Sequence, residues 1–356
     1  MKKNCTKRQW KKCILGMLLM LSSMLMACTT GTSQEVTTSQ EATESETVSN
    51  ETETTEAWSI DNLKKQVETA IEAHKQFKAE VKSKEAAKDA IRQYGVKQRE
   101  LYDNPDVEAI ELEMEQTFGL LAVNLGEIEE QTAKDIRDAF SYVYDKYPWI
   151  QDSLTNISLC NFESAKSTYV AVTQSREFMM KDAGEYPYVV KYEIILNAAK
   201  FMNREQLIKD CDILVASGQR CENTNITSIV VHELGHQLTN VYAMKEFGLT
   251  DAYYITEENA EAYSRYVTNQ LKTNQIIEQS ILESAYVLWQ SEYQQSGSEE
   301  DFRGSISGYA KGVQEDGGIS YGETIAEAIA DIYLNSDNAA DASKAIESVL
   351  TEKMKD

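Results

Sequence analysis

The sequence predicts an α+β fold in which a small sheet packs against helices and the C-terminal part is mostly helical. Three observations support this fold class: helical periodicity before residue 128, short β-prone runs between residues 154 and 197, and helical patterns from residue 226 onward. The strands and helices are grouped rather than alternating, which argues against a regular parallel α/β sheet. With 42% hydrophobic residues in 356, the chain can build a sizeable core.

Residues 1–27 have the layout of a secretory signal. Six Lys and Arg residues precede an apolar run from Ile14 to Met26, which is shorter than the roughly 20 residues that span a membrane. The tetrapeptide LMAC, which ends at Cys28, resembles the lipobox of bacterial lipoproteins, in which the cysteine is lipidated and becomes the mature N-terminus. We therefore expect an anchor on Cys28 that holds the protein at the extracytoplasmic face of the cell membrane. The alternatives are an uncleaved anchor helix and plain secretion.

Residues 28–57 consist almost entirely of Ser, Thr, Glu and Gln, a composition that predicts a disordered tether. Loss of residues 1–27 removes six positive and no negative charges, which takes the formal net charge from −23 to −29. Such a chain repels phosphate backbones and anionic headgroups, so nucleic-acid binding and a polybasic membrane contact are not expected.

Residues 58–128 read as an N-terminal segment of two or three amphipathic helices. Residues 129–356 read as one α+β domain, which begins with a helix that ends near Pro148. The β-prone runs LTNISLC, STYVAVT and YPYVVKYEIILN follow, and then the helical run NREQLIKDCDILVAS.

Three cysteines follow Cys28, namely Cys160, Cys211 and Cys221. An exported protein can oxidise thiols, and Cys211 and Cys221 are close enough in sequence to form a disulfide, which would leave one thiol unpaired. The chain contains no Cys-x-x-Cys pair of the kind that holds structural zinc.

The run VVHELGHQLTN, residues 230–240, holds two of the three histidines of the chain. In a helix, His232 and His236 lie on one face and direct both imidazoles toward one point, with Glu233 a fraction of a turn aside. Two nitrogen donors and a carboxylate that can accept a proton are what a catalytic zinc ion requires. The alternative is a core helix with incidental polar residues, although buried polar groups without partners are costly.

A catalytic zinc ion has three protein ligands and one open position, so a third ligand is needed. The remaining histidine lies in the N-terminal helices, which makes a downstream carboxylate the best candidate. One candidate pair is Glu258 and Glu261; the other is Glu323 and Glu327, which are one helical turn apart. The second pair is favoured because alanines beside it let its helix approach the histidine helix closely.

The motif HELGH, followed far downstream by GYAKGVQEDGGISYGETIAEAIADIY, resembles the zincin metallopeptidases that use a glutamate as third ligand. The resemblance is greatest to the branch that includes anthrax lethal factor and related phage-encoded and bacterial proteins, and it covers roughly residues 129–335. It implies a zincin-like metalloprotease domain, with a small mixed sheet over the metal-binding helix.

The same resemblance implies a role for each matching residue. His232, His236 and Glu323 would be the Zn²⁺ ligands and Glu233 the general base. Glu327 would contact a ligand rather than the ion itself. The tyrosine that stabilises the oxyanion maps to Tyr309, with Tyr321 as a rival because this chain has additional residues before Glu323.

We therefore expect a membrane-tethered zinc endopeptidase that acts on a protein or peptide substrate through zinc-activated water. The strand at residues 188–197 is either the edge strand that holds an extended peptide or an interior strand. The alternative function is a non-catalytic zincin-fold lipoprotein that serves as an adhesin or assembly factor.

Overall fold

The computed structural model describes residues 84–160, 162, 170–179, 188–246, 248–249, 260–312 and 319–355. The expected signal at 1–27 and tether at 28–57, including Cys28, lie outside the described residues, as does Glu258. Within the described ranges, none of the helices combines the length and the apolar character needed to cross a membrane.

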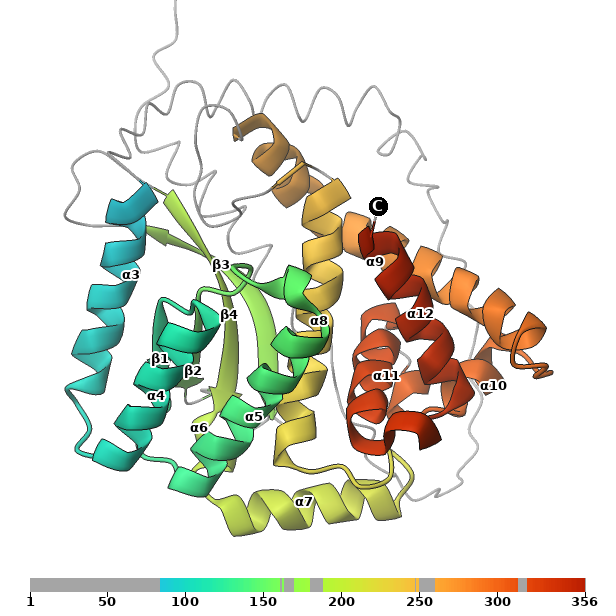
Figure 1. Ribbon diagram of the computed structural model, residues 1–356, viewed down its shortest axis with the longest axis horizontal. Helices are drawn as coiled ribbons and strands as arrows, with labels where there is room; N and C mark the ends of the chain where they lie inside the picture. The colour runs from blue at the N-terminus through green and yellow to red at the C-terminus, as the bar shows by residue number, and fades with distance from the viewer. Residues whose placement is uncertain are drawn as a thin grey trace, which may run out of the picture.

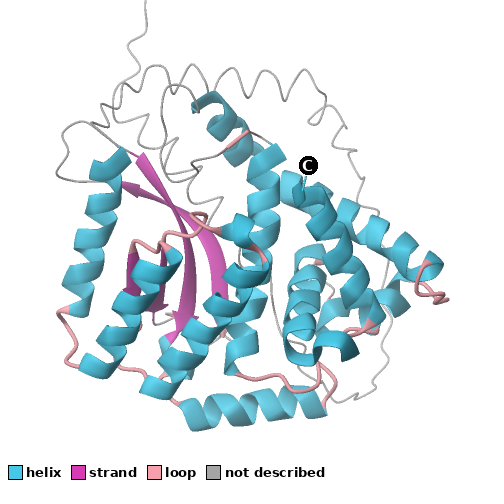
Figure 2. Cartoon of the chain, viewed as in Figure 1, coloured by secondary structure: helices cyan, strands magenta, loops and turns pink. Residues whose placement is uncertain are grey.

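The described residues form one mixed sheet of four strands, and Figure 2 shows this sheet among the helices. The strands are β1 (Ala122–Asn124), β2 (Asn156–Cys160), β3 (Ala171–Met179) and β4 (Tyr188–Asn197). Their order is β1-β2-β4-β3, with β1, β2 and β4 mutually parallel and β3 antiparallel to β4. This small mixed sheet in a mostly helical protein confirms the predicted α+β class.

The helices that precede the histidine motif pack around the sheet. They are α3 (Lys84–Arg99), α4 (Pro105–Phe118), α5 (Glu130–Lys146), η2 (Pro148–Ile150), α6 (Ala198–Phe201) and α7 (Arg204–Ala216). Helix α4 begins at a proline, which suits a first helical position, and is followed by Gly119 with φ 70°, which ends it. Helix α5 has the predicted amphipathic pattern and ends just before Pro148, as expected.

The helices of the C-terminal half are α8 (Ile226–Glu246), α9 (Ala260–Ser291), α10 (Glu299–Gly304), η3 (Tyr309–Lys311), α11 (Tyr321–Asn335), η4 (Ser336–Asn338) and α12 (Asp341–Lys355). Helix α8 lies between the sheet and the C-terminal helices (Figure 1), and it contacts β3 on one side and α11 on the other. Any site on α8 can therefore combine groups from both halves of the fold.

One continuous hydrophobic core joins these halves, from Val107 in α4 to Leu350 in α12. Within it, Phe118, Phe140 and Tyr144 form an aromatic cluster with ring centroids 5.3–5.7 Å apart. Their burial fixes α4 against α5, and α5 in turn packs on α8. The helix that carries the histidines is therefore held by the main core of the protein.

Two details differ from the sequence-based expectations. Strand β1 falls inside the segment 58–128, which was expected to be helical throughout; a strand of three residues is too short to leave a periodic signal. Residues 188–197 form β4, which lies between β2 and β3, so of the two alternatives the interior strand is confirmed and the edge strand is wrong. Strands β1 and β3 lie at the two ends of the described sheet.

Candidate metal centre

Helix α8 places His232 and His236 one turn apart on the same face. The apolar residues around them are fully buried: Val230, Val231, Leu234 and Leu238. Before the first turn, the Asn225 side chain accepts a hydrogen bond from the backbone N–H of Ser228 at 3.0 Å, which satisfies a donor that the helix leaves unpaired. The two imidazoles therefore project from a helix that is capped and rigidly packed.

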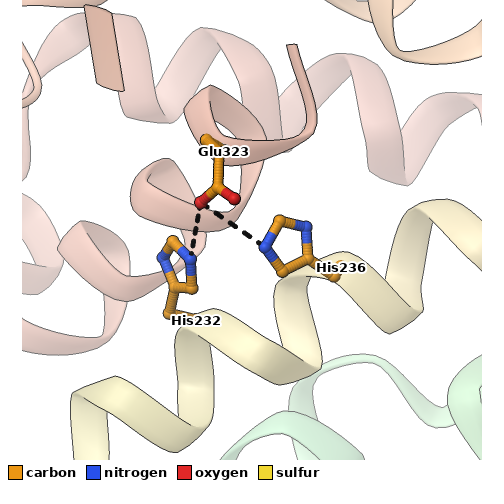
Figure 3. A group of neighbouring side chains, drawn as sticks. All are labelled: His232, His236 and Glu323. Atoms are coloured by element: carbon orange, nitrogen blue, oxygen red, sulfur yellow. Dashed lines mark hydrogen bonds and ion pairs between the residues drawn. The ribbon is translucent and has the colours of Figure 1, made fainter. Parts of the chain in front are cut away.

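The side chain of Glu323, in the first turn of α11, reaches both imidazoles (Figure 3). Its Oε2 lies 3.0 Å from Nε2 of His232 and 3.6 Å from Nε2 of His236. The ligand atoms of these three residues all lie within 4.8 Å of one another. His232 and Glu323 are buried, and His236 is partly exposed. These three residues can hold a metal ion, as expected from the sequence.

The two distances from the Glu323 oxygen can be compared with those around a tetrahedral ion. Ligand bonds of about 2.0–2.1 Å in tetrahedral geometry separate neighbouring donor atoms by roughly 3.3 Å. The two distances to the Glu323 oxygen, 3.0 and 3.6 Å, lie on either side of that value.

A close contact between α8 and α11 brings Glu323 within reach. A Cβ atom placed on Gly235 would lie 2.8 Å from the Cα of Ala326, which is too close for an unperturbed contact. Ala326 and Ala328 are fully buried. The small residues predicted to let the two helices approach do so at Ala326, and Gly235 supplies the matching gap on α8.

Without a metal ion, the charges of these groups stabilise one another. Burial tends to raise the pKa of Glu323, but His236 and His232 outweigh it and hold this pKa well below the usual range. Burial tends to lower the pKa of His236, but the Glu323 carboxylate outweighs it and raises the value to about 9. Burial and Arg220 lower the pKa of His232, yet Glu323 and Glu327 produce a net increase. A metal ion must therefore displace protons.

Glu327 lies one turn beyond Glu323 and contacts His232 from the opposite side. Its Oε1 is 2.9 Å from Nδ1 of His232, and its Oε2 accepts a hydrogen bond from the Ser307 hydroxyl at 2.8 Å. Burial would raise its pKa, but Arg220 and His232 lower it to about 2. An ionised Glu327 accepts the Nδ1 proton of His232 and leaves Nε2 available as a ligand.

Glu233 is buried and is held by a residue of the sheet. The Thr173 hydroxyl oxygen, on β3, lies 2.7 Å from Oε2 of Glu233 and 2.9 Å from its backbone oxygen. A hydroxyl has one hydrogen, so it donates to one of these acceptors at a time. Glu233 also contributes to the raised pKa of His236, which shows that its charge is felt at the centre.

Of the two tyrosines considered, Tyr309 is the one beside the histidines. Its ring centroid lies 6.0 Å from that of His232. Tyr321 is the first residue of α11 and packs, partly buried, against the hydrophobic core. The geometry therefore favours Tyr309 as a side chain that can face a group bound at the centre.

Glu278 of α9 is an additional acidic residue that sequence reasoning missed. Its carboxylate accepts a hydrogen bond from the backbone N–H of Gly322, and a Cβ on Gly322 would lie 2.9 Å from its Oε1. Burial raises the pKa of Glu278 to about 7, with His236 opposing and Glu323 adding to the rise. It anchors the first turn of the helix that carries Glu323. In a long helix of an acidic protein, no local pattern distinguishes it from a solvated glutamate.

Among the described residues, the group that could hold an ion consists of His232, His236 and Glu323. Of Glu261 the structure describes only the backbone, in the first turn of α9. Asp331, one turn beyond Glu327, accepts hydrogen bonds from the Ser343 hydroxyl and the Ala340 backbone N–H, which gives it a structural role. Cys211 and Cys221 are both buried free thiols, so the possible disulfide between them is not formed.

No protein family, curated protein or solved structure matches this chain. A functional proposal must therefore be argued from the site itself. The site is a group of two histidines and one glutamate that can hold a metal ion, with Glu233 and Tyr309 beside the histidines.

Proposed function

We propose that this chain is a zinc-dependent endopeptidase, in agreement with the resemblance of its motifs to zincins. The observation that carries the proposal is the convergence of His232, His236 and Glu323 from two helices on one point. Two imidazoles and one carboxylate are a ligand set typical of catalytic zinc, which leaves a fourth position for water or substrate. The Glu233 carboxylate, next to the first ligand in sequence, supplies the base.

The chemistry is divided among the residues of the site. Bound zinc would lower the pKa of a coordinated water and polarise a substrate carbonyl. Glu233 accepts the proton of the attacking water and then passes it to the leaving amine. The Thr173 hydroxyl restrains the Glu233 carboxylate during both transfers. The Tyr309 hydroxyl donates a hydrogen bond to the oxygen on which negative charge develops.

The position of Thr173 also supports a substrate path along β3. This strand lies at the end of the described sheet, and Thr173 joins it to the general base. An extended peptide that pairs with the backbone of β3 would pass beside Glu233. This role moves the expected peptide-binding strand from β4 to β3.

The test is proteolysis of an unstructured substrate such as casein by the purified chain, with Glu233→Gln as the control. The proposal requires turnover by the wild type and loss of at least about 1,000-fold in the variant, because the residual rate lacks general-base catalysis. Zinc content, measured by plasma emission, should be equal in both proteins. Equal inertness of both against a broad substrate panel would instead favour the non-catalytic adhesin or assembly factor.

We further propose that a lipid on Cys28 holds the enzyme at the extracytoplasmic face of the membrane. The support is the LMAC sequence at the end of a signal-like segment. Mass spectrometry of the N-terminus of the membrane-extracted protein should show a lipidated cysteine at position 28. An unmodified N-terminus at Met1 would refute this anchor.

A further inference from the structure

The segment before α8 runs beside the segment that carries Tyr309. The backbone N–H of Gly308 donates to the oxygen of Gly218, and that of Tyr309 donates to the oxygen of Gln219, both at 2.8 Å. A Cβ on Gly308 would lie 2.7 Å from the Gly218 oxygen, so this approach depends on the glycine. The backbone of Tyr309 is therefore fixed directly beside the residue that follows Gln219.

That next residue, Arg220, makes three contacts with one guanidinium group. Its central carbon lies 4.0 Å from the centre of the Tyr309 ring. Its Nη1 forms an ion pair with Oε1 of Glu327 and lies 3.2 Å from Nδ1 of His232. The Arg220 side chain is 20% exposed and that of Glu327 is 2% exposed, so this ion pair is largely shielded from water.

The hydrogen-bond roles at this point follow from the chemistry of the groups. The Arg220 nitrogen is always a donor. When Nε2 of His232 faces a metal ion, Nδ1 carries the proton and is also a donor. Both nitrogens therefore donate to the same oxygen of Glu327, from which Nδ1 of His232 is 2.9 Å away. The 3.2 Å contact between them is an approach of two donors to a shared acceptor.

A lysine in place of Arg220 could keep the positive charge near Glu327, but it could not also cover the Tyr309 ring. A guanidinium is planar and can stack on an aromatic face while its edge makes an ion pair, whereas an ammonium is a compact point charge. Substitution by lysine can therefore remove the stacking of Arg220 on the Tyr309 ring while it keeps a positive charge near Glu327.

We propose that Arg220 is a positioning residue that holds the Tyr309 ring at a fixed place relative to Glu327 and His232. This inference rests on the proposed peptidase function for its kinetic consequence, since Tyr309 is the proposed oxyanion donor. Arg220 would, however, link the position of the Tyr309 ring to Glu327 and His232 whether or not the site cleaves peptides.

The kinetic test is a double-mutant cycle with Arg220→Lys and Tyr309→Phe. We expect Arg220→Lys to lower kcat 10- to 100-fold with KM changed less than threefold and zinc content retained. In the Tyr309→Phe background, which lacks the hydroxyl, Arg220→Lys should change kcat less than about twofold. Equal effects in both backgrounds would mean that Arg220 does not act through Tyr309 and would overturn the proposal.

A matched control is Arg99→Lys, which alters a partly buried arginine paired with Glu111 and Glu115 in the α3–α4 region. This variant should leave kcat within twofold of the wild type. If Arg220→Lys behaves in the same way as Arg99→Lys, Arg220 only contributes to folding.

A second measurement separates this inference from the peptidase proposal. The rings of the 19 tyrosines are labelled isotopically for NMR. The NMR signal of Tyr309 is assigned by its loss in Tyr309→Phe. Zinc addition should shift the Tyr309 signal in the wild type, and this shift should fall by at least half in Arg220→Lys. If no substrate of the broad panel is cleaved but the shift behaves in this way, the peptidase proposal fails and the positioning role stands. A zinc-induced shift equal in both proteins refutes the positioning role.

Discussion

Gly235 of α8 lies directly against Ala326 of α11, with space for no additional carbon between them. The Cα of Ala326 would be 2.8 Å from a methyl group on Gly235, and its Cβ would be 3.3 Å away. Gly235 stands between His232 and His236 on α8, and Ala326 lies about one turn beyond Glu323 on α11. The distance between the helices at this point therefore sets whether three donor atoms can share one ion.

Gly235→Ala should weaken both the fold and the centre. In an open helix position this change would stabilise the protein by about 0.5–1 kcal/mol, because alanine is the better helix former. Here the clash dominates, and we expect a loss of about 1–3 kcal/mol in the free energy of unfolding. Zinc affinity should fall at least about tenfold because Glu323 is pushed away. Chemical denaturation and a competition titration measure the two effects; a more stable variant would contradict the tight contact.

Glu323→Gln should abolish tight zinc binding. The amide is a poorer ligand than the carboxylate, and it cannot balance the charge of the ion. We expect zinc affinity to fall at least about 100-fold, as measured after dialysis by plasma emission and by competition with a coloured chelator. Glu258→Gln and Glu261→Gln are the matched controls and should retain zinc. Full zinc occupancy in Glu323→Gln would assign the third ligand elsewhere.

Zinc affinity should rise with pH. The pKa of His236 is raised to about 9 in the metal-free protein, so at pH 7 its imidazole is protonated and must lose that proton to bind an ion. The apparent affinity should therefore be roughly 100-fold lower at pH 7 than at its plateau and should rise about tenfold per pH unit up to about pH 9. Titrations between pH 6.5 and 9.5 measure this slope, and a flat profile would contradict it.

The metal-free fold should show the opposite dependence. The folded-state pKa of His236, about 9, lies above its ordinary value of 6.5, so protonation favours the folded state. This stabilisation is fully present below pH 6.5 and is lost as the pH rises through about 9. Thermal melts of the chelator-treated protein should therefore show a falling Tm across this range, and His236→Gln should weaken this fall.

Thr173→Val should slow catalysis without releasing zinc. Valine keeps the shape of the side chain but cannot donate to the Glu233 carboxylate, which loses the contact at 2.7 Å. We expect kcat to fall about tenfold, an effect of one hydrogen bond to a charged group. Thr173→Ser, which keeps the hydroxyl, should stay within about threefold of the wild type. If Thr173→Val and Thr173→Ser are equally active, the hydroxyl does not restrain the base.

The parts of the site that depend on local periodicity could be predicted from the sequence. The spacing of His232 and His236 requires only a helix, and the alanines around Glu323 indicated a close helix contact. Strands β2, β3 and β4 were each foreseen near their observed positions, although β3 begins at Ala171 and extends to Met179. Each of these signals lies within one element of secondary structure.

The parts that depend on distant pairing could not be predicted. The order of the strands places β3 rather than β4 at the end of the sheet, and no residue pattern in β4 distinguishes an edge strand from an interior one. Arg220 lies in a connecting segment without periodicity, and its contacts with Tyr309 and Glu327 arise only when α7, η3 and α11 come together. Glu278 meets Gly322 in the same way, across two helices.

His232 and Glu323 are 91 positions apart in the chain, and the whole of α9 and α10 lies between them. An ion that joins their side chains acts as a cross-link that closes a long loop, and long loops are where such a closure restricts the unfolded chain most. Binding of the ion should therefore fasten α11 to α8. A chain that has not yet acquired its metal would be the form most open to degradation, so metal supply would set how much of the protein persists.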